Sequence, residues 1–181
     1  VKFLQLDWKN RASLRSALEG ASAVVHTAGP YLGEKPIVLE EAIAAGVGVY
    51  VDVSDPVDYI NAAKALDAKA KAAGTLALCS AGAFPGLSNV LAMECAERLG
   101  ERVKDIDFAY FTAGLGGSGE VNLMITNQGF GEPMLTFTNG RLTPTFTAGL
   151  NPRNVAFYLK KSDPSFSLIG DRQVWNWPFP E

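Results

Sequence analysis

The sequence is poor in the residues that build disulfides and metal sites, since it holds two cysteines and one histidine among 181 residues. Cys79 and Cys95 stand in apolar segments without metal-ligand spacing, so we expect two free, buried thiols and no metal centre. Such sparing use of cysteine suits a reducing compartment.

An excess of charge of one sign is also missing. The 16 basic and 19 acidic residues are well mixed and leave a formal net charge of -3. No basic surface is therefore available to release counterions from a phosphate backbone, and a nucleic-acid partner is not expected.

Long hydrophobic runs are absent as well. The uncharged stretch 72–93 is interrupted by glycine, proline and asparagine, so it predicts a strand, a loop and a helix start instead of a membrane span. The chain opens at Val1 on strand-like residues and not on a leader, and we expect it to begin inside a larger protein. What is present, 48% hydrophobic and 19% charged residues, is typical of a globular fold.

Strand and helix patterns alternate along the first hundred residues. Asn10 is placed to cap the first helix, while Gly20, Gly46 and Gly74 are placed to end the three helices. Short apolar strands that alternate with helices predict a parallel sheet with helices on both sides, which is half of a doubly wound, Rossmann-type α/β fold. We expect strands at 1–7, 23–27, 47–53 and 75–79, and helices at 12–19, 34–45 and 57–73.

The pattern changes after Gly86. It predicts a helix at 88–99, a strand at 106–112, a glycine-rich loop and then short strands rich in threonine and phenylalanine. We therefore expect two domains: residues 1–100, the C-terminal part of a Rossmann domain, and residues 101–181, part of an α+β domain.

Ligands of doubly wound sheets bind at the carboxyl ends of the strands, and the segment His26–Tyr31 follows such an end. There Gly29 would let the backbone approach a cofactor and Pro30 would fix the turn, although a tight connection without a ligand fits the same residues. His26 suits either a general acid or a hydrogen-bonded core residue, and the second is more frequent inside an apolar strand.

Three aspartates also end predicted strands. Asp7 could accept a hydrogen bond from a ribose or adenine group, or it could cap the helix that follows. Asp52 alternates with apolar residues and is the better site candidate. Asp55 precedes Pro56 and is expected to cap the next helix.

The segment Cys79–Asn89 combines a strand end, a glycine–proline loop and a helix start. Free backbone donors at a helix N-terminus bind anions, so a substrate carboxylate could dock at Ser88 and Asn89; plain N-capping is the alternative. Cys79 would need a neighbouring base to act as a nucleophile, and the sequence shows none.

These motifs occur together in a known family. The strand that ends at Asp7, the segments His-Thr-Ala-Gly-Pro-Tyr31 and Tyr-Val-Asp52, and Ala-Gly-Ala-Phe-Pro-Gly-Leu-Ser-Asn89 resemble, in this order, the saccharopine dehydrogenase and reductase superfamily. The likeness covers nearly the whole chain. With Thr112–Gly119, the chain is most similar to an uncharacterised plant and cyanobacterial branch.

The resemblance implies a soluble, cytoplasmic or plastid NAD(P)-dependent oxidoreductase that transfers hydride to or from an unidentified amino-acid-like or imine substrate. NADP or NAD would lie between two loops, while the first strand and the glycine-rich pyrophosphate loop would precede Val1 and be absent from this chain. Tyr31, Asp52 and Cys79 are the candidate catalytic groups, and a homodimer or a larger complex is the expected association. The expected cofactor-binding residues are Asp7, Thr27, Ala28, Gly29, Pro30, Cys79, Gly82, Pro85 and Gly86.

Three further patterns point elsewhere. Gly114–Gly119 matches G-x-G-x-x-G but lacks an acidic residue about twenty positions later, which disfavours a dinucleotide-binding loop. The resemblance implies instead that it belongs to the second domain, where it could line a substrate pocket. Tyr31 and Lys35 have the Tyr-x-x-x-Lys spacing of short-chain dehydrogenases, but one strand too early. The aromatic segment Trp175–Glu181 suits packing inside the second domain or contact with another protein.

The alternative function is a non-catalytic subunit or scaffold that retains the fold.

Overall fold

The computed structural model describes residues 2–100, 103–106, 108, 133–146, 153–157 and 172–176. The chain divides into two units, Val1–Ile106 and Asp107–Glu181. The motif Gly114–Gly119 and the residues 177–181 of the aromatic segment lie outside the described residues. So does most of the expected strand at 106–112, of which the described residues, Ile106 and Phe108, are in no strand.

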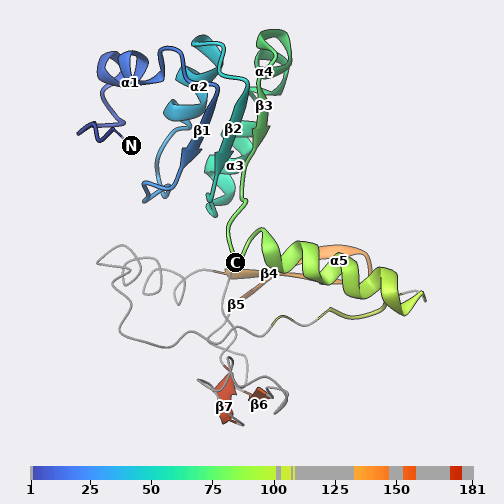
Figure 1. Ribbon diagram of the computed structural model, residues 1–181. Helices are drawn as coiled ribbons and strands as arrows, with labels where there is room; N and C mark the ends of the chain where they lie inside the picture. The colour runs from blue at the N-terminus through green and yellow to red at the C-terminus, as the bar shows by residue number, and fades with distance from the viewer. Residues whose placement is uncertain are drawn as a thin grey trace. The chain divides into compact units, whose positions relative to one another are not determined.

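The first unit contains a three-stranded parallel sheet in the order β1-β2-β3 (Figure 1). Its strands are β1 (Ala23–His26), β2 (Val49–Asp52) and β3 (Leu76–Leu78). The register pairs His26 with Asp52 and Val51 with Leu78. Because the strands run in one direction, the loops that follow them meet at the same edge of the sheet. The expectation of an α/β fold with a parallel sheet is therefore confirmed for these three strands.

The described residues of the first unit form five helices: α1 (Arg11–Leu18), α2 (Ile37–Ala44), α3 (Val57–Lys64), α4 (Asp67–Ala73) and α5 (Leu87–Leu99). Asn10 caps α1 as expected, since its Oδ1 accepts from the N–H groups of Ala12 and Ser13 at 3.1 and 3.2 Å. The second helix begins three residues later than expected, because Pro36 disfavours helical backbone at the residue before it.

The helix expected at 57–73 is interrupted between α3 and α4. The N–H of Leu66 donates to the carbonyl of Ala63 at 3.0 Å, which tightens the turn at this point. The side chain of Leu66 packs against the core. The break thus comes from a tertiary contact that alanine-rich periodicity does not reveal.

One hydrophobic core lies on one face of the sheet. It draws on α1, α2 and α3 and centres on Leu39 and Tyr50, which are 1% and 0% exposed. On the opposite face Val25 and Leu76 are 70% and 69% exposed. Helices therefore cover only one face in the part of the chain that is described, and the expectation of helices on both sides is wrong there. The core residues are Leu14, Leu18, Val38, Leu39, Ala42, Val47, Tyr50 and Ala63.

The strand expected at 1–7 is not formed by residues 2–7. Phe3 is 93% exposed and Leu4 is 64% exposed. A strand needs a hydrogen-bonded neighbour, and among the described residues β1 pairs only with β2. The alternating pattern is therefore present without the partner that would make it a strand.

In the second unit the described residues form two antiparallel pairs: β4 (Pro133–Thr138) with β5 (Arg141–Phe146), and β6 (Arg153–Phe157) with β7 (Arg172–Asn176). Asn139 and Gly140, both with positive φ, form the two-residue turn between β4 and β5. Short strands in this region were expected and are confirmed. Across the described ranges, no helix combines the length and the apolar character needed to cross a membrane.

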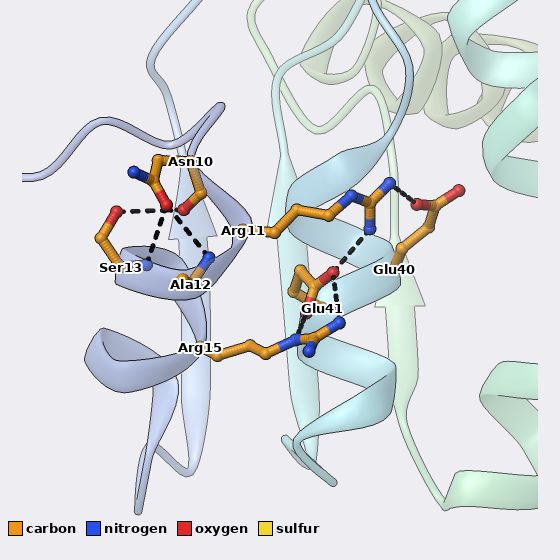
Figure 2. A network of polar contacts seen from close by, with 7 residues as sticks. All are labelled: Asn10, Arg11, Ala12, Ser13, Arg15, Glu40 and Glu41. Atoms are coloured by element: carbon orange, nitrogen blue, oxygen red, sulfur yellow. Dashed lines mark hydrogen bonds and ion pairs between the residues drawn. The ribbon is translucent and has the colours of Figure 1, made fainter.

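An ion-pair network joins α1 to α2 (Figure 2). Arg11 and Arg15 of α1 both donate to the carboxylate of Glu41 in α2, and Arg11 also reaches Glu40. The Glu41 side chain is only 2% exposed, whereas those of Arg11 and Arg15 are 44% and 65% exposed. The hydrogen bond from Arg15, followed by that from Arg11, lowers the pKa of Glu41 from its ordinary value of 4.5.

We expect Glu41→Gln to lower the free energy of unfolding by about 1–2 kcal/mol at neutral pH, since solvent around both arginines screens the pair. Because the folded pKa is depressed, the contribution of Glu41 is present above pH 4.5 and is lost as the pH falls through the lowered value. The variant should therefore lose less stability on acidification than the wild type. Urea unfolding at neutral and acidic pH measures both effects. Glu40→Gln, which removes a more exposed partner of Arg11, is the matched control; equal effects of the two variants would contradict the prediction.

Candidate functional site

Three loops follow β1, β2 and β3 and meet at the carboxyl edge of the sheet: residues 27–31, 53–55 and 79–86. Thr27, Ala28 and Gly29 are exposed, whereas Tyr31 is buried. The hydroxyl of Tyr31 donates to the carbonyl of His26 at 2.7 Å, which folds the first loop back onto the end of β1. The edge is thus both anchored and open to solvent.

His26 lies in an aromatic cluster beneath this edge. Its ring centroid lies 5.5 Å from that of Trp8 and 5.1 Å from that of Tyr31, which in turn lies 5.1 Å from the ring of Tyr59. Burial lowers the pKa of His26, and the charge of Asp52 opposes this only in part. The imidazole is therefore neutral at neutral pH, which fits the core role better than that of a cationic acid.

Asp52 is fully buried, and its carboxylate accepts several hydrogen bonds at the edge. Its Oδ1 accepts from the backbone N–H of Ser54 at 3.1 Å, from the Ser54 hydroxyl at 2.7 Å and from the N–H of Ser80 at 2.9 Å. Its Oδ2 accepts from the Tyr50 hydroxyl at 2.9 Å. Four donors thus hold this carboxylate in place, so its main effect is to tie β2 to the loop after β3.

Tyr31 is a candidate acid with a strongly held proton. Burial raises the pKa of its hydroxyl to about 12. The backbone N–H of Val53 lowers it only in part. Tyr31 could therefore donate its proton only to a strongly basic group of a bound substrate.

The Cys79 thiol is held in its protonated form. Burial, followed by the charge of Asp52, raises the pKa of this thiol to about 12. A thiolate is the nucleophilic species, so Cys79 is a poor nucleophile at neutral pH. Cys95, in contrast, is exposed, and the expectation that it is buried is wrong because none of the residues of α5 is buried.

We expect a thiol-alkylating reagent to modify Cys95 rapidly in the folded protein and Cys79 more slowly by at least about tenfold. The reason is the combination of the raised pKa of Cys79 with its partial burial, which is less than the full burial expected from the sequence. Peptide mass spectrometry after timed alkylation at neutral pH measures the two rates separately. In denaturant the rates should converge, and equal rates without denaturant would contradict the described environment of Cys79.

The N-terminus of α5 is closed by its own loop. The N–H groups of Leu87 and Ser88 donate to the carbonyls of Gly82 and Ala83 at 2.9 and 3.0 Å, and the side chain of Asn89 accepts from Gly86 at 2.9 Å. Gly86 has a φ of 133°, and a Cβ there would lie 2.3 Å from the carbonyl oxygen of Gly82. Only glycine fits this turn. Ser88 and Asn89 therefore belong to a capped helix start, and N-capping is the alternative that the structure supports over carboxylate docking.

Two of the aspartates contribute less to the edge than expected. The Asp7 side chain accepts from the nearby backbone N–H of Lys9 at 2.9 Å, a local turn before α1. Asp55 does not cap α3, since Pro56 occupies the N-cap position and no side chain bonds there. That expectation is wrong because α3 begins at Val57, one residue too late for Asp55 to be its cap.

Sequence reasoning missed Ser54, Ser80, Tyr50 and Tyr59 as members of this site. One signal was available: an aspartate followed two residues later by serine is the pattern of a turn in which the carboxylate accepts from that N–H. For Ser80 the sequence carries no such signal. Its φ is 60°, an unusual value for a residue other than glycine.

The chain was also compared with known proteins. No family model matches it, and no curated protein and no solved structure matches it significantly. Among the described residues no group of three or more histidine, cysteine or acidic side chains is placed to hold a metal ion. The features that bear on function are therefore the geometry of the edge and the motifs of the sequence.

Proposed function

We propose that the chain is part of a Rossmann-type, NAD(P)-dependent oxidoreductase. The more specific proposal is a saccharopine-dehydrogenase-like enzyme that acts on an amino-acid-like or imine substrate. The observation that supports it best is the convergence of loops 27–31 and 79–86 at one edge of a parallel sheet, which is where such sheets bind nucleotides.

The space around Gly29 indicates whether the loop 27–31 can accommodate a cofactor. Its φ lies outside the left-handed region, and a Cβ added there would meet only Tyr31, at an ordinary 3.8 Å. The packing of the protein thus places no demand for glycine at this exposed position. Space beside an accessible backbone suits the close approach of a nucleotide.

In this proposal the nicotinamide nucleotide supplies or accepts the hydride. The chain would bind it between Thr27, Ala28, Gly29 and Pro30 on one side and Cys79, Gly82, Pro85 and Gly86 on the other. Tyr31 and Cys79 keep their protons at neutral pH, so either could donate a proton only to a strongly basic intermediate. Asp52 would act by holding the loop 79–86.

A second candidate is a non-catalytic subunit that retains the fold. The hydrogen bonds at the edge favour it, because the chain itself supplies the hydrogen-bond partners of Asp52 and of the α5 N-terminus. A scaffold would need these bonds for stability alone.

The test is a fluorescence titration of NADPH with the protein in its full natural length. The expected result is saturable binding in the micromolar range, reversed by excess NADP. A folded protein that leaves NADPH fluorescence unchanged would overturn the oxidoreductase proposal and leave the scaffold. Circular dichroism of the same sample shows whether it is folded.

A further inference from the structure

The hydroxyl of Ser80 is buried at the carboxyl edge of the sheet and lacks a hydrogen-bond partner among the described residues. Buried hydroxyl groups are nearly always paired, because burial without a partner is unfavourable. A polar group left unpaired at the edge where a nucleotide is proposed to bind is suited to receive a bond from that ligand.

Ser80 and Ala81 each make one hydrogen bond to Asp52. The N–H of Ser80 donates to Oδ1 of Asp52 at 2.9 Å, and the next N–H, that of Ala81, donates to the Asp52 carbonyl at 2.8 Å. These bonds stabilise the left-handed backbone of Ser80, which a non-glycine residue rarely adopts. The position of the hydroxyl is thus determined by β2 and not only by β3, the strand that precedes Ser80.

Thr75 offers an internal comparison. Its hydroxyl is also buried and without a partner in the described part of the chain. It precedes β3, however, and so lies at the amino end of the sheet, opposite the loops. Burial alone therefore does not distinguish the two hydroxyls, but their place in the fold does.

We infer that Ser80 is a ligand-binding residue whose hydroxyl hydrogen-bonds to the nicotinamide nucleotide, and that Asp52 is the positioning residue that presents it. This inference rests on the proposed function. It adds a specific polar contact and assigns Asp52 a role through Ser80 and not through proton transfer.

The experiment compares NADPH affinity and thermal unfolding in the full-length wild type and in Ser80→Ala, with Thr75→Val as the matched control. Ser80→Ala removes a hydroxyl that makes no bond within the described residues, so the unfolding temperature should not fall. The dissociation constant should rise roughly three- to tenfold, the effect of one neutral hydrogen bond. Thr75→Val should leave binding unchanged and should not lower the unfolding temperature.

Two Asp52 variants test the positioning role. Asp52→Asn keeps an oxygen acceptor for Ser80 and should bind NADPH nearly as well as the wild type. Asp52→Ala removes the acceptor and should weaken binding at least as much as Ser80→Ala. If Asp52→Ala does not fold, Asp52→Asn decides: a loss of affinity equal to that of Ser80→Ala, in a stable variant, would overturn the positioning role.

The outcomes separate the two levels of the proposal. Wild-type binding that Ser80→Ala leaves unchanged would overturn this inference while the proposed function stands. No binding by the folded wild type would overturn the proposed function, and the inference with it.

Discussion

Replacement of Tyr50 by alanine is expected to lower the free energy of unfolding by about 3–5 kcal/mol, the range for loss of a large buried aromatic side chain. Tyr50 is 0% exposed and is the largest of the fully buried side chains. Its ring fills the core between the sheet and the helices, and its hydroxyl donates to Asp52 at 2.9 Å. The variant would therefore leave a cavity and remove a donor from a buried carboxylate.

Tyr50→Phe separates these two contributions. The phenylalanine ring keeps the packing and removes only the hydroxyl, which also lies 3.4 Å from that of Tyr59. We expect a loss of about 1–2 kcal/mol for the missing hydrogen bond. Urea unfolding followed by circular dichroism gives both values. An alanine variant as stable as the phenylalanine variant would show that Tyr50 does not occupy the core as described.

The second large effect is expected at Gly29, where alanine should weaken NADPH binding by roughly tenfold or more. A Cβ at this position meets no protein atom closer than 3.8 Å, so folding should tolerate it. The proposed nucleotide, however, would lie against this exposed backbone. Loss of binding with an unchanged unfolding midpoint is therefore the expected combination.

Gly48→Ala is the matched control for Gly29→Ala. Gly48 is exposed at the amino end of β2, and its added Cβ would lie 3.4 Å from the carbonyl oxygen of Ser22. It should leave NADPH binding unchanged, because it lies at the opposite end of the sheet from the loops. Equal affinities of the wild type and Gly29→Ala would exclude the first loop from the nucleotide site.

The helices of the first unit could largely be predicted because their signals are local. Asn10 caps α1, and Gly74 ends α4 in a left-handed conformation. The errors arise where a distant contact decides. Residues 2–7 alternate like a strand but have no strand beside them, and the break at Leu66 depends on packing against the core.

The candidate site could be predicted in part for a similar reason. The carboxyl ends of parallel strands meet at one edge, so a sequence that predicts the strands also predicts that His26, Asp52 and Cys79 come together. What it could not predict is which polar groups form hydrogen bonds with one another. The four donors around Asp52, and the Ser80 hydroxyl that has no partner in the described part of the chain, depend on backbone turns that residue type alone does not determine.

The Asp52 carboxylate has a practical consequence for the search for a substrate. It contacts Ser80 through one oxygen and Tyr50 through the other, so the loop at the edge and the centre of the core share one buried group. A compound that fastens this loop should therefore raise the melting temperature of the whole first unit. A ligand at a free concentration of about 100 times its dissociation constant adds about 2.7 kcal/mol to the free energy of unfolding. Thermal melting of the protein with a collection of amino acids and imines would thus report ligands without any assumption about the reaction.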